Sequence, residues 1–207
     1  MPKKPSNKTI KTRIYKGDFI AGTLLVAESR KIARLLLDNV TEEAWNKAIR
    51  VDNILQKQSL DMAMRQAKLI RQRLCLMKPA FWQFVSQGTY ELAAQALLAA
   101  TVKHNRLIGD FLLRVVKQHW QMFENKLTTK DWHNFLEECT HIEPTIAHWT
   151  ESTRQKLGSL LFSMLAEAHY IDSIRSKQIT PIFIVSELRS YLTNNNENYI
   201  LSCLDIN

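Results

Sequence analysis

Glycine, proline and cysteine are all scarce in this chain of 207 residues. Five glycines and five prolines, scattered along the sequence, supply too little turn chemistry for a protein of many β-strands, so helices are favoured. The three cysteines, Cys75, Cys139 and Cys203, are odd in number and far apart. This spacing argues against a disulfide framework and fits a reducing compartment.

Long apolar runs are also missing. The longest uncharged stretches, 79–90 and 92–102, are separated by Glu91, and each is well short of the roughly 20 residues that a bilayer requires. Residues 1–16 are charged but lack the apolar segment that follows in a signal peptide. The sequence therefore predicts a cytoplasmic protein that neither enters nor binds a membrane.

Motifs for catalysis or cofactor binding are absent as well. The glycines are isolated, and none has the spacing of a phosphate-binding loop. The best metal-site candidate is the set His133, Cys139, His141 and His148, but this spacing matches no familiar zinc site, so core and surface roles are favoured. We expect no catalytic residues, no cofactor and no metal, and hence a protein that is not an enzyme.

Positive charge is present in excess and is unevenly distributed. The formal net charge is +8, with a pI near 9.5. Residues 1–78 hold 17 Lys and Arg against 7 Asp and Glu, whereas residues 128–207 hold 6 against 10. A gradient this steep is typical of a protein that meets a polyanion with one part of its surface. A merely solubilising N-terminal region is the alternative interpretation.

Helical periodicity begins near Gly22 and continues to the C-terminal region. Good N-cap residues precede several apolar stretches, among them Thr41, Ser59, Thr89, Thr128 and Thr150. We expect an all-α bundle of about eight to ten helices, with a helix opening at Pro181. The expected division is a flexible basic arm (1–18), a basic helical domain (19–127) and a smaller C-terminal helical domain (128–207).

Three groups of cations are candidates for nucleic-acid binding. The first group is the arm, the second is a ridge on the first helix, and the third is the outward face of the long helix after Ser59. That long helix carries two apolar stripes, so we expect it to be packed on two sides. A solvated face, with Arg65 paired to Asp61, is the alternative for the third group. The candidate residues are Lys3, Lys4, Lys8, Lys11, Arg13, Lys16, Arg30, Lys31, Arg34, Arg65, Lys68 and Arg71.

Four stretches taken together resemble the BrxA family of BREX phage-resistance systems. They are 22–36 (GTLLVAESRKIARLL), 53–74, 106–116 (RLIGDFLLRVV) and 149–168 (WTESTRQKLGSLLFSMLAEA). The resemblance extends from about Phe19 to Leu192 and rests on the order of these stretches, since none is catalytic. It implies a small all-helical protein similar in fold to NusB-type antitermination proteins, encoded beside methyltransferase and ATPase components and able to bind DNA. The resemblance assigns no catalytic or binding role to any particular residue of this chain.

The resulting hypothesis is a double-stranded DNA-binding accessory protein of a BREX system that is held mainly by phosphate contacts. RNA binding, which the NusB analogy favours, is one alternative. A protein–protein adaptor that docks other BREX components through its acidic C-terminal part and exposed aromatics such as Trp149 is another. The oligomeric state and any sequence preference stay open.

Overall fold

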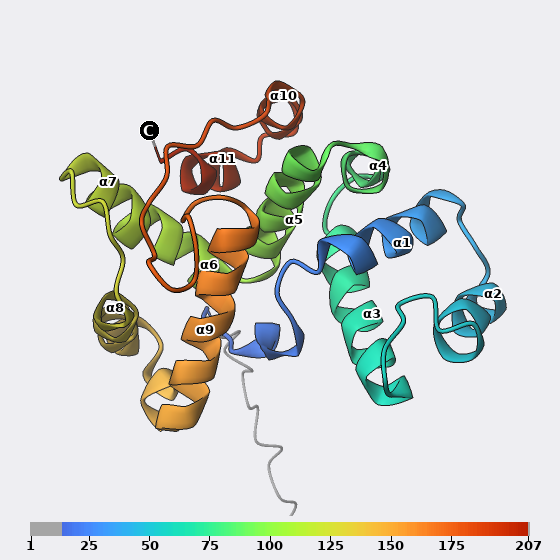
Figure 1. Ribbon diagram of the computed structural model, residues 1–207, viewed down its shortest axis with the longest axis horizontal. Helices are drawn as coiled ribbons and strands as arrows, with labels where there is room; N and C mark the ends of the chain where they lie inside the picture. Colours follow the sequence, from blue (N-terminus) through green and yellow to red (C-terminus); the bar gives the residue numbers. More distant parts are fainter. Residues whose placement is uncertain (1–13, 207) are drawn as a thin grey trace, which may run out of the picture.

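A computed structural model describes residues 14–206 of the chain, and in this range the fold is all-α (Figure 1). Because α6, η3 and α7 follow one another without a break, the expectation of about eight to ten helices is confirmed. The α-helices are α1 (Val26–Leu37), α2 (Glu42–Asn46), α3 (Leu60–Leu74), α4 (Pro79–Gln87), α5 (Tyr90–His104), α6 (Arg106–Phe111), α7 (Lys117–Gln121), α8 (Thr129–Ile142), α9 (Glu151–Glu167), α10 (Ser186–Asn194) and α11 (Asn198–Leu204). The shorter turns are η1 (Asp18–Ala21), η2 (Lys47–Val51), η3 (Leu112–Val116) and η4 (Pro144–His148).

Side-chain caps start most of the longer helices where the sequence predicts them. The side chains of Thr41, Ser59, Thr89 and Thr150 each accept a hydrogen bond from a backbone N–H three residues later. Thr128 forms a complete capping box with Asp131. These bonds satisfy N–H groups that the first helical turn leaves without partners, so local chemistry fixes where these helices begin.

Helix α5 lies at the centre of the molecule (Figure 1). Every residue from Leu92 to Val102 is buried, because α1, α3, α4, α6, α10 and α11 all pack against this helix. A helix that is apolar on all sides belongs in the interior of a bundle. The other helices are therefore positioned by their contact with α5, directly or through a neighbour.

The stretch after Pro181 corrects a prediction, because no helix begins there. The chain stays extended until α10 starts at Ser186. Buried Gln95 donates a hydrogen bond to the carbonyl of Phe183 (3.0 Å) and accepts one from the N–H of Val185 (2.9 Å). A side chain of α5 thus satisfies backbone groups that a helix would otherwise pair, and the extended form is stable without a strand partner.

Helix α3 also departs from the prediction that two apolar stripes hold it on both sides. The main stripe is buried, and Ala63, Ile70 and Leu74 are at most 1% exposed. Of the second stripe only Leu69 is buried, while Met62 and Leu76 are 40% and 43% exposed. The helix is therefore firmly packed on one face, and its opposite face is largely open.

The last two helices return to the first half of the chain. Both α10 and α11 pack against α5, and the buried apolar residues from Tyr15 to Ile206 form one continuous cluster. An isolated β-bridge also joins Lys126 to Gln178, which lie on the two sides of residue 128. The expected domain boundary near residue 128 stays a prediction, although helices from both sides of it share a core. Between residues 14 and 206, no helix is long and apolar enough to cross a bilayer.

Candidate nucleic-acid interface

The outward face of α3 carries two cations that point to solvent. Arg65 and Lys68 are exposed, and their helix is anchored on the opposite side by the buried stripe. The Nε of Arg65 donates to the main-chain carbonyl of Asp61 (3.2 Å), which is not a bond to the Asp61 carboxylate. The guanidinium keeps its charge and most of its donors for a partner.

Arg71 is more strongly held than its two neighbours. Its Nη2 is 2.7 Å from the Glu42 carboxylate, and its guanidinium carbon lies 4.5 Å from the centre of the Trp45 ring. The side chains of Arg71 and Glu42 remain 39% and 65% exposed. The ion pair raises the pKa of Arg71 and lowers that of Glu42. Arg71 therefore joins α2 to α3 while still facing the surface.

The ridge predicted on α1 separates into structural and exposed cations. Arg30 donates to the carbonyls of Gly88 (2.8 Å) and Ser86 (3.4 Å) at the end of α4, and Lys31 donates to the carbonyl of Ile54 (2.7 Å). Both side chains therefore hold neighbouring backbone segments in place through these hydrogen bonds. Arg34 alone of the three is exposed.

The arm is described only from Ile14 onward, so Lys3, Lys4, Lys8, Lys11 and Arg13 lie outside the described residues. Lys16 is exposed, and its carbonyl accepts a hydrogen bond from Asn105 (2.8 Å). Tyr15, 2% exposed, donates its hydroxyl to Asp110 (2.7 Å). The base of the arm is thus part of the packed structure.

Asp110 lies four residues before Arg114, the spacing at which exposed ion pairs form on a helix. Asp110 is buried, however, and its carboxylate accepts hydrogen bonds from the hydroxyls of Tyr15 and Tyr199. The Nε of Arg106 lies 3.3 Å from the same carboxylate. Arg114 pairs with Glu138 (2.6 Å). Burial and the nearby carboxylate raise the pKa values of both tyrosines, so these groups stay neutral hydrogen-bond donors.

A surface hollow of about 490 Å³ lies between α2, η2 and α3. Its lining includes a further cation, Arg50 of η2, together with Lys68 and Arg71 of α3. Sequence periodicity missed Arg50 because it is placed by the π-helical turn η2, which shifts side chains away from the regular helical spacing. Its presence beside Lys47 and the exposed cations of α3 enlarges the basic surface.

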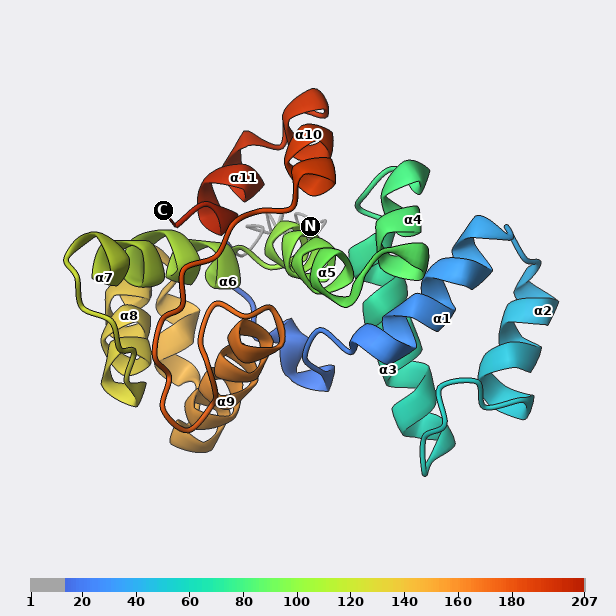
Figure 2. The same ribbon diagram turned by 45° about the horizontal axis from the view of Figure 1, so that its top comes forward.

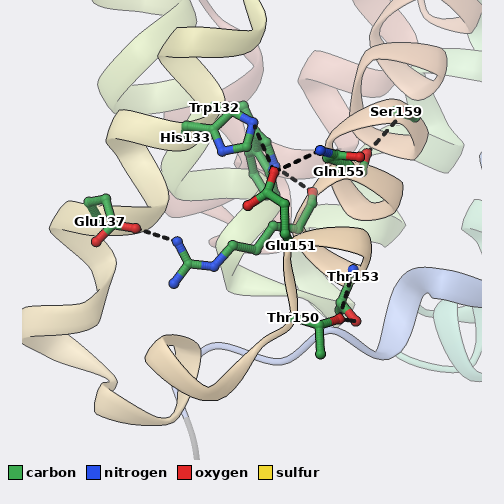
Figure 3. Close-up of polar contacts among 9 residues, drawn as sticks. Trp132, His133, Glu137, Thr150, Glu151, Thr153, Gln155 and Ser159 are labelled. Atoms are coloured by element: carbon green, nitrogen blue, oxygen red, sulfur yellow. Dashed lines mark hydrogen bonds and ion pairs between the residues drawn. The ribbon is translucent and has the colours of Figure 1, made fainter.

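The acidic C-terminal half is largely paired internally. Glu137 of α8 is bonded to Arg154 of α9, and the Nε1 of Trp132 donates to the Arg154 carbonyl (2.8 Å); Glu137 and Trp132 are labelled in Figure 3. His133 approaches Glu151 at 3.9 Å. These contacts hold α8 against α9.

The histidines and the cysteine of the metal-site candidate do not share a site. Cys139 is buried, and burial raises the pKa of its thiol to about 11, whereas His141 and His148 are exposed. Among the described residues, no three His, Cys, Asp or Glu side chains gather as metal ligands. Trp149, which the adaptor hypothesis took as exposed, is half-buried and packs against the core.

Comparison with known proteins gives one consistent result. The family model BrxA matches residues 13–196. A curated protein of Paramagnetospirillum magneticum (strain ATCC 700264 / AMB-1), named "BREX protein BrxA", is 41% identical over 93% of this chain and 96% of its own length. The protein of the same name from Escherichia coli O9:H4 (strain HS) is 32% identical over 91% of this chain and 89% of its own length.

A solved structure agrees with the fold. The crystal structure of an uncharacterized protein from Magnetospirillum magneticum superposes with a TM-score of 0.87 at 40% identity, covering 94% of this chain and 100% of the other. Since the family model spans most of the sequence and the relatives align almost end to end, the chain belongs to the BrxA family.

Proposed function

We propose that the chain is a non-enzymatic, double-stranded DNA-binding accessory protein of a bacterial BREX anti-phage system, acting in the cytoplasm. The relatives that carry the name BREX protein BrxA support the place in a BREX system. The charge distribution supports DNA as the partner, because residues 1–78, which hold the large excess of cations, include the exposed Arg50, Arg65 and Lys68.

The observation that carries the proposal is the face of α3. Arg65 and Lys68 are exposed on a helix whose other side is fixed in the core, and Arg50 lines the hollow together with Lys68. Cations with a preset geometry lose little conformational entropy when phosphates bind. Contacts of this kind give affinity without base recognition, so binding is expected to be weakly dependent on sequence.

Reversing the two exposed α3 cations tests this proposal. Arg65→Glu with Lys68→Glu should weaken binding to a short duplex strongly and make the slope of log K against log salt shallower by about 2, the number of phosphate contacts removed. Fluorescence anisotropy at several salt concentrations measures both quantities, and circular dichroism checks the helical content.

The matched control is Lys156→Glu with Arg175→Glu, which reverses two exposed cations in the acidic half. It makes the same change in net charge and should reduce affinity far less. Equal losses in the two double variants would contradict a localised interface. Tighter binding of a structured RNA than of the duplex, at one salt concentration, would replace DNA by RNA as the partner.

A further inference from the structure

The hollow beside α3 combines an apolar floor with a cationic rim. Among its lining residues Trp45, Ile49 and Met64 are apolar, and Arg50 and Lys68 are exposed cations. Its volume of about 490 Å³ lies in the range of small-molecule sites. In Figure 1 and Figure 2 this region lies at the end of the molecule opposite α7 and α8. Any ligand there is held by α2, η2 and α3 alone.

A stacked pair stands at one wall of the hollow. The guanidinium of Arg71 lies over the indole of Trp45, and the bond to Glu42 fixes its position. Both groups present flat surfaces, and both stack well on nucleobases. The wall is built from α2 and α3 together, so it is more rigid than a lone aromatic side chain on a loop.

The charge balance of the hollow favours an anionic ligand. Its lining holds three cations and one carboxylate, and that carboxylate, Glu42, is bonded to Arg71. Arg50 and Lys68 are left to attract negative charge. Aromatic and apolar surface beside such cations is the combination with which proteins bind unpaired nucleic acid, bases against the floor and phosphates on the rim.

We propose that this hollow takes an unpaired nucleobase of a DNA strand, with the adjoining phosphates on Arg50 and Lys68. A base inside an intact duplex is covered by its stacked neighbours and cannot enter. The inference rests on the proposed function and adds a preference: DNA with an unpaired segment should bind more tightly than a perfect duplex of the same length.

Three labelled DNAs test the preference: a perfect duplex, the same duplex with a central bubble, and one strand alone. The parent protein should bind the bubble about tenfold more tightly than the perfect duplex, the gain expected from stacking one base. A bubble with 2-aminopurine at the unpaired position should change its fluorescence on binding, which reports stacking without any substitution in the protein.

A substitution that fills the hollow distinguishes the contribution of the base to binding from that of the phosphates. Met64→Trp adds bulk to the floor without changing charge, and it should abolish the preference for the bubble while leaving affinity for the perfect duplex unchanged. The matched control is Met62→Trp, an exposed position on α3 that does not line the hollow, which should keep the preference. Thermal unfolding of both variants verifies that they are folded.

The outcomes distinguish the two proposals. Absence of binding to all three DNAs at low salt overturns the proposed function. Equal binding of bubble and duplex by the parent, with no change in 2-aminopurine fluorescence, overturns only the inference about the hollow. So does a Met64→Trp protein that folds and still prefers the bubble. Competition by free deoxynucleotide, without any preference among the DNAs, would instead assign the hollow to a mononucleotide and overturn the inference.

Discussion

Arg73 shows that a cation on the helix of the candidate interface can be wholly structural. It is 1% exposed, and its guanidinium donates to the carbonyls of Thr23 (2.5 Å) and Gly22 (3.3 Å). Burial lowers its pKa to about 10, and the charges of Asp18 and Glu167 oppose that shift, so the group is still charged at neutral pH. Arg65, an arginine on the same helix, is exposed instead.

Replacing each arginine by methionine should therefore separate stability from binding. Arg73→Met removes the donors from two part-buried carbonyls and should reduce the free energy of unfolding by about 2–4 kcal/mol. Arg65→Met should change it by less than about 0.5 kcal/mol yet weaken DNA binding. Urea unfolding and anisotropy measure the two effects. A stable Arg73→Met protein would show that the buried bonds contribute little.

His104 makes stability depend on pH. It is half-buried, its Nδ1 has no hydrogen-bond partner, and burial lowers its pKa below 6.5, with Arg73 and Lys16 acting in the same direction against Asp18. The unfolded chain therefore takes up this proton more readily than the folded chain. Above pH 6.5 the side chain is neutral in both states and does not reduce the free energy of unfolding. As the pH falls from 6.5 towards the pKa of the folded chain, protonation of the unfolded chain lowers the free energy of unfolding.

Substitution tests the contribution of this side chain. His104→Gln should lose less unfolding free energy between pH 7.5 and 5.5 than the parent does, as measured by urea unfolding at both pH values. His141→Gln, at an exposed position, should behave like the parent. Identical pH dependence in the parent and in His104→Gln would show that another group causes the acid sensitivity.

At the scale of the helix, the contact between α8 and α9 depends on Gly158. A Cβ atom at this position would lie 2.6 Å from Cδ1 and 2.7 Å from Nε1 of the Trp132 side chain, whose Nε1 is bonded to the Arg154 carbonyl (Figure 3). Gly158→Ala should force the indole aside and cost about 1–3 kcal/mol of stability. Ser159→Ala, one residue further on the exposed side, is the control and should be nearly neutral. Differential scanning calorimetry measures both, and equal melting temperatures would mean that α9 shifts without strain.

Helix starts were predictable because capping is local chemistry, and Thr128 with Asp131 shows it most completely. The extended segment after Pro181 was not predictable, because its backbone partners come from Gln95, on a helix distant in sequence. The same distinction holds at the candidate interface. Periodicity found Arg65 and Lys68, but it could not tell that Arg30 and Lys31 close loops, since their acceptors are carbonyls elsewhere in the chain.

At the scale of the whole molecule, the uneven charge predicts how binding responds to salt. If about four to seven phosphates are neutralised, the slope of log K against log salt should be about −4 to −6. Deleting residues 1–13 removes five cations (Lys3, Lys4, Lys8, Lys11 and Arg13) and should make the slope shallower while weakening binding moderately. Anisotropy titrations from low to physiological salt measure this, and affinity that does not change with salt would contradict an electrostatic mode.

The bond network at Asp110 has a consequence for how the protein is made. This buried carboxylate receives the hydroxyl of Tyr15 from one end of the chain and that of Tyr199 from the other. During synthesis the ribosome supplies Tyr15 before Asp110, but Tyr199 follows Asp110 by 89 residues and emerges much later. Helix α5 is likewise covered on one side only after α10 and α11 have been synthesised. The nascent chain therefore leaves the apolar surface that α10 and α11 cover exposed until both helices have been translated, and it should become resistant to protease only after that point.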